Sequence, residues 1–314
     1  FAAAAAAPII LNIILIFSLI FSYIYELNYS KNLSYGVTLA GVIQLVFLIF
    51  FTRKYYKPKI QFKLNITSKV KFFLKRLLPS IFSSGVTQIN IFVGTIIASF
   101  QAGAVSYLYY ADRVYQINLA IAGIAVGTVS LPALTKAIKT KNIFNIKKIQ
   151  NKSTELSLLL SIPGSLGLII ASEEITNALF GYGSFSEKNA LITAEAIKYF
   201  GYGVPAFALI KVLSNFFFAR DNTLIPFYLS FFIVLLNIII SLSFFNIIGF
   251  IIIPIATSTT TWLGILLYIY LLKKRNFFNI EINFLKNFFK ILLSSLFMSL
   301  ILHYGLDYFS DSLA

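Results

Sequence analysis

Long apolar stretches alternate with short polar gaps along the whole chain. A helix needs about 20 residues to cross the hydrocarbon core of a bilayer, and nine stretches reach roughly that length. They are 3–24, 34–52, 77–100, 104–131, 154–172, 191–218, 223–246, 248–271 and 284–304. Because the gaps are short, neighbouring helices should run antiparallel. The pattern predicts an all-α protein, a polytopic transmembrane helix bundle of about nine spanning helices.

Composition agrees with this prediction and excludes several classes of function. The chain has 314 residues, of which 58% are hydrophobic and 12% are charged; soluble domains carry about 25% charged residues. It has no Cys and one His, which argues against a disulfide framework or a transition-metal site. Nucleotide-binding, zinc-protease, serine-hydrolase and Asp-rich magnesium motifs are missing from the sequence. We therefore expect no enzyme activity, no cofactor and no bound metal.

Positive charge is concentrated in alternate gaps. The gaps 53–76, 132–153, 219–222 and 272–283 hold nineteen Lys and Arg, whereas the opposite gaps hold two. Loops rich in Lys and Arg stay in the cytoplasm, so this first set should be cytoplasmic. Most of the net charge of +15 then serves to orient the protein in the membrane and to contact anionic lipid headgroups. It does not indicate binding of nucleic acid. Within the second of these gaps, residues 133–150 are predicted to form a short amphipathic helix on the cytoplasmic face.

Charged side chains inside the predicted span 104–131 are the most informative residues of the chain. Asp112 and Arg113 lie about nine residues from its outer end, roughly 13 Å deep at about 1.5 Å per residue. An ionised group at that depth costs at least a few kcal/mol, so it should face a hydrated cavity or a partner. Ser106, Tyr109, Arg113 and Gln116 follow steps of three, four and three, which places them on one helix face. The alternative is that Arg113 only balances Asp112.

The preceding span, 77–100, carries a polar stripe of its own. Its members are Ser80, Ser84, Gln88, Thr95 and Ser99. Two adjacent antiparallel helices with facing polar stripes predict a shared hydrated groove. The alternative is ordinary hydrogen bonding between packed helices by small polar residues.

A third polar helix is predicted over 191–218. Lys211 either extends its side chain to the cytoplasmic interface or adds positive charge to the inner half of a cavity. Glu195 and Lys198, three residues apart, are placed to neutralise each other.

At this point several runs of residues resemble a known family. The run YYADRVYQ at 109–116 is followed by GIAVGTVSLPALTK at 123–136, and SNFFFARDNTLIPF occupies 214–227. Together with APIILNI at 7–13 and SFQAGAV at 99–105, they are similar to the MurJ/MviN family of lipid II flippases. That family belongs to the multidrug/oligosaccharidyl-lipid/polysaccharide exporter superfamily.

The resemblance implies a two-lobe flippase fold of fourteen helices, two lobes of six plus a terminal pair. Aligned on these motifs, the chain is expected to be a fragment that lacks the first four helices and the last. Residues 1–60 would be the last two helices of the N-terminal lobe, 68–275 the six-helix C-terminal lobe, and 280–314 an additional transmembrane helix. The family often has Glu where this chain has Gln116, which leaves a carboxylate's role at that place in question.

The implied activity is movement of lipid II from the inner to the outer leaflet of the bacterial cytoplasmic (inner) membrane, by alternating access, for cell wall synthesis. Arg113 would grip the diphosphate, helped by Asp112, Ser106, Tyr109, Gln116, Gln88 and Lys211 as substrate-binding residues. The partners implied are lipid II and membrane lipids, with no nucleic acid, no cofactor and a monomeric protein. Three alternatives stay open: a flippase for another polyprenyl-diphosphate glycan, a small-molecule or cation exporter of the same superfamily, or a scaffold without transport.

Overall fold

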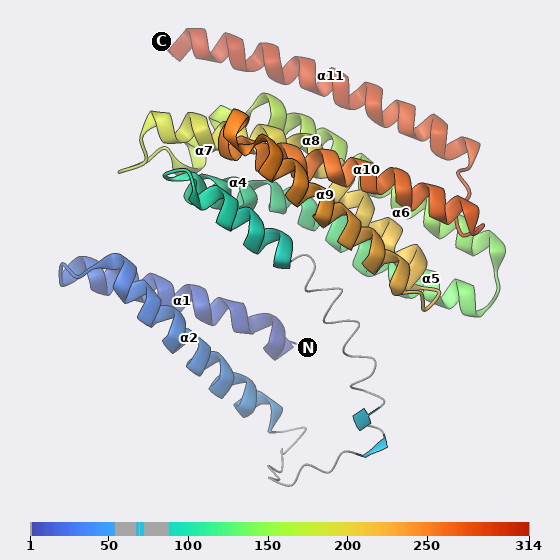
Figure 1. Cartoon of the computed structure of the whole chain (residues 1–314), viewed down its shortest axis with the longest axis horizontal. Coiled ribbons are helices and arrows are strands. Elements are labelled where there is room, and N and C mark those ends of the chain that lie inside the picture. Colours follow the sequence, from blue (N-terminus) through green and yellow to red (C-terminus); the bar gives the residue numbers. More distant parts are fainter. Residues whose placement is uncertain (1, 54–66, 69, 72–87, 314) are drawn as a thin grey trace. The chain divides into compact units, whose positions relative to one another are not determined.

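The structure is a computed structural model that describes residues 2–53, 67, 68, 70, 71 and 88–313 (Figure 1). Within these residues every regular element is a helix, which confirms the all-α prediction. The chain divides into two compact units, Phe1–Lys71 and Phe72–Ala314, and each is described by itself. The finer division expected at 275–280, between a six-helix lobe and an additional helix, stays a prediction.

Seven helical stretches of the described residues are long and apolar enough to cross a membrane. One of them, Leu224–Lys274, contains two of the predicted spans as the separate helices α9 (Leu224–Ile248) and α10 (Ile252–Lys274). The predicted span 77–100 is described over its end, as the helix Gln88–Ser99. With these taken into account, each of the nine predicted spans coincides with a helix within the described ranges.

The first unit is a hairpin of α1 (Ala2–Ile24) and α2 (Tyr29–Thr52). Two hydrogen bonds join the helices: the Gln44 amide donates to the Ala7 carbonyl over 2.9 Å, and the Asn32 amide donates to the Ser22 hydroxyl over 2.9 Å. Gly36 lies so close to the Ser18 side chain that a Cβ would collide with it. These small polar contacts let two apolar helices approach closely, as is usual in a membrane.

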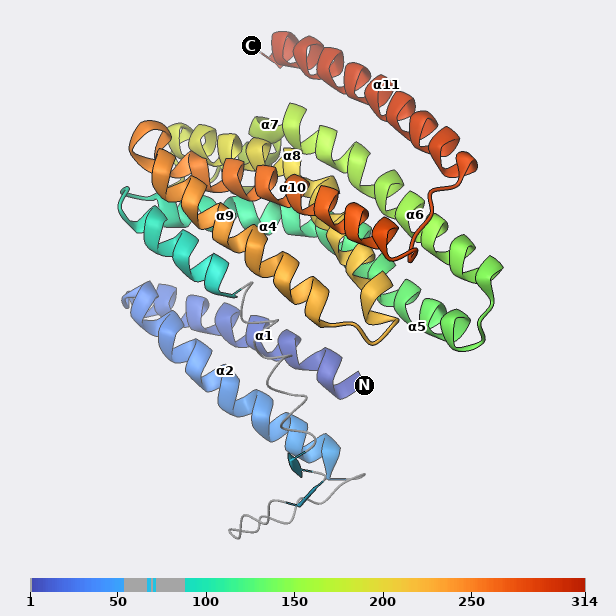
Figure 2. The same cartoon turned by 45° about the vertical axis from the view of Figure 1, so that its right-hand side comes forward.

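The second unit surrounds one central helix, α8 (Glu187–Phe218), whose residues are mostly buried. Helices α4, α5, α6, α7 and α10 pack around it, and α11 lies along α6 (Figures 1 and 2). A short helix, α7, occupies part of the predicted outer gap 173–190. The remaining bounds are α4 (Ala104–Leu119), α5 (Val126–Lys139), α6 (Ile143–Ile170), α7 (Ser172–Phe180) and α11 (Ile282–Leu313).

Pro205 interrupts the hydrogen bonding of α8 without ending the helix. A proline in a helix leaves the carbonyl four residues earlier without its donor, and that carbonyl belongs to Gly201. The Ser165 hydroxyl of α6 donates to it over 2.7 Å. Two nearby carbonyls of α8 also accept from α10: Tyr199 from Ser258 over 2.7 Å and Tyr202 from Trp262 over 2.9 Å. The turn of α8 around Pro205 is therefore hydrogen-bonded to both α6 and α10.

The predicted amphipathic helix over 133–150 is wrong. Its first part is the end of α5 and its second part is the beginning of α6, with a turn at 140–142 between them. Lys141 adopts the left-handed conformation, φ 52°, which commonly terminates a helix. The Asn142 side chain then accepts from the Asn145 amide over 3.0 Å and caps α6. These two residues make a hairpin where hydrophobic spacing suggested one continuous helix.

Gly249 reverses the chain between α9 and α10. It has φ +75°, and a Cβ there would lie 2.8 Å from Oε1 of Gln101. That oxygen accepts from the Phe250 amide over 2.9 Å. Glycine is required because the backbone conformation and the close approach both exclude a side chain.

Arg220 fastens the α10–α11 connection to the end of α8. Its guanidinium donates to the Phe216 carbonyl over 2.6 Å and to the Phe277 carbonyl over 3.1 Å, and it lies 4.3 Å from the centre of the Phe277 ring. Gln150 of α6 donates to the same Phe277 carbonyl over 2.7 Å. Burial lowers the pKa of the Arg220 guanidinium, but an arginine still stays charged at neutral pH. We call this group, Arg220 with Phe216, Phe277 and Gln150, the loop clamp.

Candidate functional site

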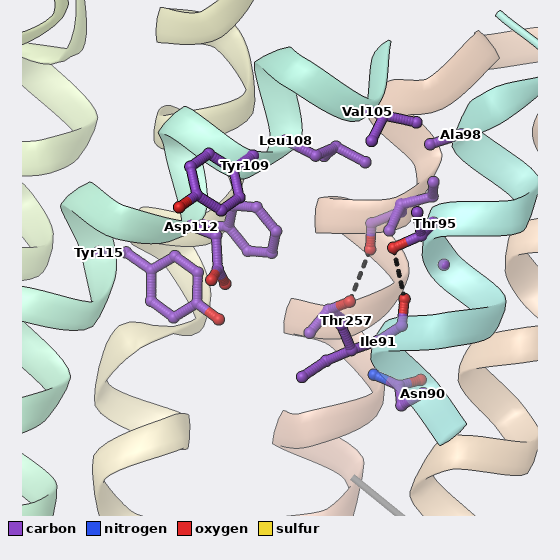
Figure 3. A pocket seen from close by; sticks show the side chains of 13 residues that line it. Asn90, Ile91, Thr95, Ala98, Val105, Leu108, Tyr109, Asp112, Tyr115 and Thr257 are labelled. Atoms are coloured by element: carbon purple, nitrogen blue, oxygen red, sulfur yellow. Dashed lines mark hydrogen bonds between the residues drawn. The ribbon is translucent and has the colours of Figure 1, made fainter. Parts of the chain in front are cut away.

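A cavity of about 300 Å³ lies between α4 and the helix Gln88–Ser99 (Figure 3). Helices α8 and α10 supply the remaining wall. The polar and aromatic residues that line it are Asn90, Thr95, Tyr109, Asp112, Tyr115, Phe200 and Thr257. This cavity lies between the two helices for which a shared groove was predicted, and of the two predicted stripes it is lined by Thr95 and Tyr109.

Hydrogen-bond acceptors dominate the polar wall of this cavity. Asp112 is half-buried and accepts a hydrogen bond from the Gln116 side-chain amide. The hydroxyls of Thr95 and Thr257 donate to carbonyls of their own helices, over 2.8 and 2.7 Å (Figure 3), and the Thr257 hydroxyl also accepts from the Asn237 amide over 2.9 Å. Oδ1 of Asn90 is buried and has no hydrogen-bond partner among the described residues. The described lining contains no Lys, Arg or His, so this wall suits a ligand that donates hydrogen bonds.

The predicted stripe on α4 is present on an exposed face of the helix. The side chains of Ser106, Tyr109 and Arg113 are exposed, and Gln116 is half-buried. Arg113 donates to the Tyr109 hydroxyl over 3.1 Å, and its guanidinium lies 4.8 Å from the centre of that ring. Tyr109 also lines the cavity. It therefore connects the charged face of α4 with the cavity wall.

Asp112 and Arg113 do not form a contact ion pair. Within the described ranges, oppositely charged groups come within 4.0 Å at Lys152–Glu155 and His303–Asp307. Asp112 instead accepts a hydrogen bond from Gln116, one turn along α4. The Arg113 charge is thus left free of direct carboxylate contact in the part of the chain that the structure describes.

Of the seven predicted site residues, Asp112 and Tyr109 line the cavity, whereas the other five do not: Ser106, Arg113, Gln116, Gln88 and Lys211. Gln88 and Lys211 are both exposed, and neither is among the lining residues. Ser80 and Ser84 of the predicted stripe lie outside the described residues. No described side-chain contact links Gln88 or Lys211 to Arg113, so their role stays a prediction.

Asn90 is a site residue that the sequence reasoning missed. It is a single amide within an apolar segment and falls off the predicted Ser/Thr stripe. Its position inside a predicted span could have indicated a role, since polar side chains in membrane spans need hydrogen-bonding partners.

The position of α4 is fixed by close contacts with α6 and α8. A π-helical turn, Ala120–Ala125, follows α4 and leads into α5. Within it, a Cβ on Gly123 would lie 2.9 Å from the Cα of Ala208. The Asn215 amide of α8 donates to the Gly127 carbonyl over 2.8 Å. Such turns are frequent next to functional sites.

A second polar cavity, of about 470 Å³, lies at the other end of α8 from the loop clamp. Glu195 and Lys198 line it together with Glu173 and Glu174 of α7 and His303 of α11. The mutual neutralisation suggested for Glu195 and Lys198 is not seen, because their charged groups are not within 4.0 Å in the described structure.

A family model described as lipid II flippase MurJ matches residues 1–314. The chain belongs to the MurJ family. A probable lipid II flippase MurJ of Rickettsia prowazekii is 38% identical over 316 residues, which cover 98% of this chain and 61% of that protein. The corresponding protein of Rhizobium meliloti is 33% identical, covering 99% of this chain and 59% of that protein. The chain thus spans about three fifths of the length of these MurJ relatives.

Solved structures agree with this membership. A lipid II flippase MurJ in an inward closed conformation matches with a TM-score of 0.78 and 28% identity, over 96% of this chain and 61% of that one. An outward-facing MATE family transporter of the MOP superfamily matches with a TM-score of 0.55 and 18% identity, over 70% of this chain and 50% of that one. The second match concerns the fold alone. The resemblance to MurJ and the polytopic membrane fold are both confirmed.

Proposed function

We propose that this chain forms part of a lipid II flippase of the bacterial cytoplasmic membrane. In this proposal it transports a lipid-linked precursor by alternating access, catalyses no reaction, needs no cofactor and works as a monomer. Membership of the MurJ family supports the substrate. The lysine-rich connections at one end of the second unit support the orientation, since such loops stay in the cytoplasm.

The observation that carries the proposal is Arg113 on the exposed face of α4. A diphosphate-linked headgroup cannot cross hydrocarbon unaided, and a guanidinium offers the paired donors that a phosphate accepts. Arg113 is available for this because its described hydrogen bond goes to a neutral phenol, Tyr109. Ser106 and Gln116 extend the same face and supply further polar contacts.

The cavity beside Arg113 then takes an uncharged part of the headgroup. Its wall carries Asp112 and no described cation, so a diphosphate would be repelled. Sugar hydroxyls and amides donate hydrogen bonds, and the acceptors of Asp112, Asn90 and Thr95 can receive them. Charge thus separates the two roles: the diphosphate lies at Arg113 and the sugars lie in the cavity.

A chimera tests the proposal, because the chain covers part of the length of its relatives. Residues 1–314 replace the matching segment of the Rickettsia prowazekii relative, in a bacterium depleted of its own lipid II flippase. We expect growth to be restored and lipid II to reach the outer leaflet. The unmodified relative is the positive control. A chimera that is abundant in the membrane but leaves lipid II inside, while the relative restores transport, would exclude this function.

The same assay separates the alternatives. A flippase for another polyprenyl-diphosphate glycan would leave lipid II inside while moving its own glycolipid. An exporter of small cations, which Asp112 could serve, would lower cation accumulation without affecting lipid II.

A further inference from the structure

The turn between α5 and α6 carries an uncompensated positive charge. Six lysines lie between Asp112 and Glu155, and that stretch contains no Asp or Glu. Lys152 pairs with Glu155 over 3.1 Å. The other five are exposed and have no ion-pair partner within the described ranges: Lys136, Lys139, Lys141, Lys147 and Lys148.

A groove runs along α5 next to these lysines. It encloses about 520 Å³ and is lined by Leu131, Pro132, Thr135, Lys136, Lys139 and Thr140. Its lining changes along the helix, from Leu131 and Pro132 in the middle of α5 to lysines and a threonine hydroxyl at the turn. A molecule with an apolar chain and an anionic head matches that order.

Apolar side chains project from the same turn. Ile143 and Phe144, at the beginning of α6, are 68% and 74% exposed. They stand directly between Lys141 and the pair Lys147 and Lys148 in the sequence. Helices that combine exposed aromatic and aliphatic residues with lysines bind at the membrane interface, with the apolar groups among acyl chains.

The turn lies at the end of the unit where the interface with the cytoplasm is expected. The loop clamp joins the beginning of α6, the end of α8 and the α10–α11 connection at that end, and Figure 2 shows the α5–α6 turn beside them. Charge, groove and exposed apolar groups therefore meet at one level of the bundle.

From these observations we infer that the α5–α6 turn is a binding site for an anionic phospholipid. The ammonium groups of Lys136, Lys139 and Lys141 hold the headgroup phosphate, the groove receives an acyl chain, and Ile143 and Phe144 lie in the surrounding lipid. Arg220 is not part of this site, because its guanidinium lies in the loop clamp and donates to two protein carbonyls there. The site does not depend on which substrate the protein transports.

The test compares two triple variants of the 314-residue chain in mild detergent. One is Lys136→Gln/Lys139→Gln/Lys141→Gln. The matched control is Lys273→Gln/Lys274→Gln/Arg275→Gln, three exposed cations at the end of α10. Native mass spectrometry measures the dissociation constants for phosphatidylglycerol and for phosphatidylcholine with the same acyl chains. Thermal unfolding verifies that each variant is folded.

Each lysine near an anionic surface contributes about fivefold to affinity. We expect the first variant to bind phosphatidylglycerol at least about tenfold more weakly, and the control to change it less than about threefold. Ile143→Ser/Phe144→Ser should weaken the binding of both lipids. Equal losses in the two triple variants would indicate general charge attraction and overturn the site.

Two further results would also overturn it. If phosphatidylcholine binds the unmodified chain as tightly as phosphatidylglycerol, the lysines do not select the headgroup. If millimolar inorganic phosphate displaces phosphatidylglycerol, the turn is a site for free phosphate rather than for a lipid. Persistence of phosphatidylglycerol binding in phosphate supports the lipid.

Discussion

Replacing Arg113 by alanine should abolish transport while leaving the protein folded. The side chain is exposed on α4, and its described contacts are one hydrogen bond and one ring contact, both to Tyr109. Little packing is lost with it, and removal of a charge from a spanning helix eases insertion. The variant is made in the chimera described above, so that the transport machinery is complete.

The size of the effect follows from the donors that the guanidinium presents. Hydrogen bonds to charged groups contribute about 1.5–3 kcal/mol each, and a bidentate grip on phosphate uses two. Arg113→Ala therefore costs about 3–6 kcal/mol, or roughly a hundred- to ten-thousandfold in affinity for the diphosphate. Arg113→Lys keeps the charge but loses the planar pair of donors, and should cost about ten- to a hundredfold.

The assay measures appearance of lipid II in the outer leaflet at matched protein abundance. Tyr109→Phe serves as the control, because it removes the hydroxyl that accepts from Arg113 and retains the ring beneath the guanidinium. It should reduce transport by about a factor of five to ten, the worth of one ordinary hydrogen bond. If Tyr109→Phe reduced transport as much as Arg113→Ala does, the Tyr109 hydroxyl rather than the Arg113 cation would be the essential group.

The competing explanation holds that Arg113 only balances Asp112. It predicts that Asp112→Asn/Arg113→Gln recovers what each single change loses. The structure argues against this, because Asp112 accepts from Gln116 and Arg113 donates to Tyr109. Recovery of the double variant to near the unmodified rate would refute the phosphate-binding role.

Two further predictions concern the loop clamp and the orientation. Arg220→Met loses two carbonyl contacts and should destabilise the chain by about 2–4 kcal/mol, measured as a lower midpoint of thermal unfolding. The control Arg275→Met, at an exposed residue, should leave the midpoint unchanged. An equal decrease of the midpoint in both variants would refute the stabilising role of the loop clamp. Cysteines at Lys148 and Ser184 should react with an impermeant reagent from the cytoplasmic and the outer side, respectively, and labelling of both from one side would contradict the orientation.

Much of the fold was predictable because each span carries its own signal. Within the described residues, hydrophobic length located a helix at each predicted span without knowledge of its neighbours, since backbone groups in hydrocarbon must be paired within the segment. The amphipathic helix over 133–150 was wrong because hydrophobic spacing is insensitive to a three-residue turn. The left-handed conformation of Lys141 and the cap at Asn142 decide the chain direction there.

The candidate site was predictable as far as one helix could reveal it. The spacing of Tyr109, Arg113 and Gln116 places them on one face, and the structure has them on that face. The cavity itself required residues distant in sequence, such as Phe200 and Thr257. Their arrangement depends on the packing of α8 and α10 against α4, which periodicity along a single segment does not report.

The cations show the same difference between properties that the sequence predicts and properties that depend on tertiary packing. In the sequence, Arg220 and Lys136 are equal members of the cytoplasmic set, and both support the orientation. In the structure, Arg220 is held by the carbonyls of Phe216 and Phe277, whereas Lys136 lies exposed at the rim of a groove. The orientation rule depends only on which side a cation occupies, so it holds for both. Binding of an anion depends on which cations remain free, and that distinguishes the α5–α6 turn from the loop clamp.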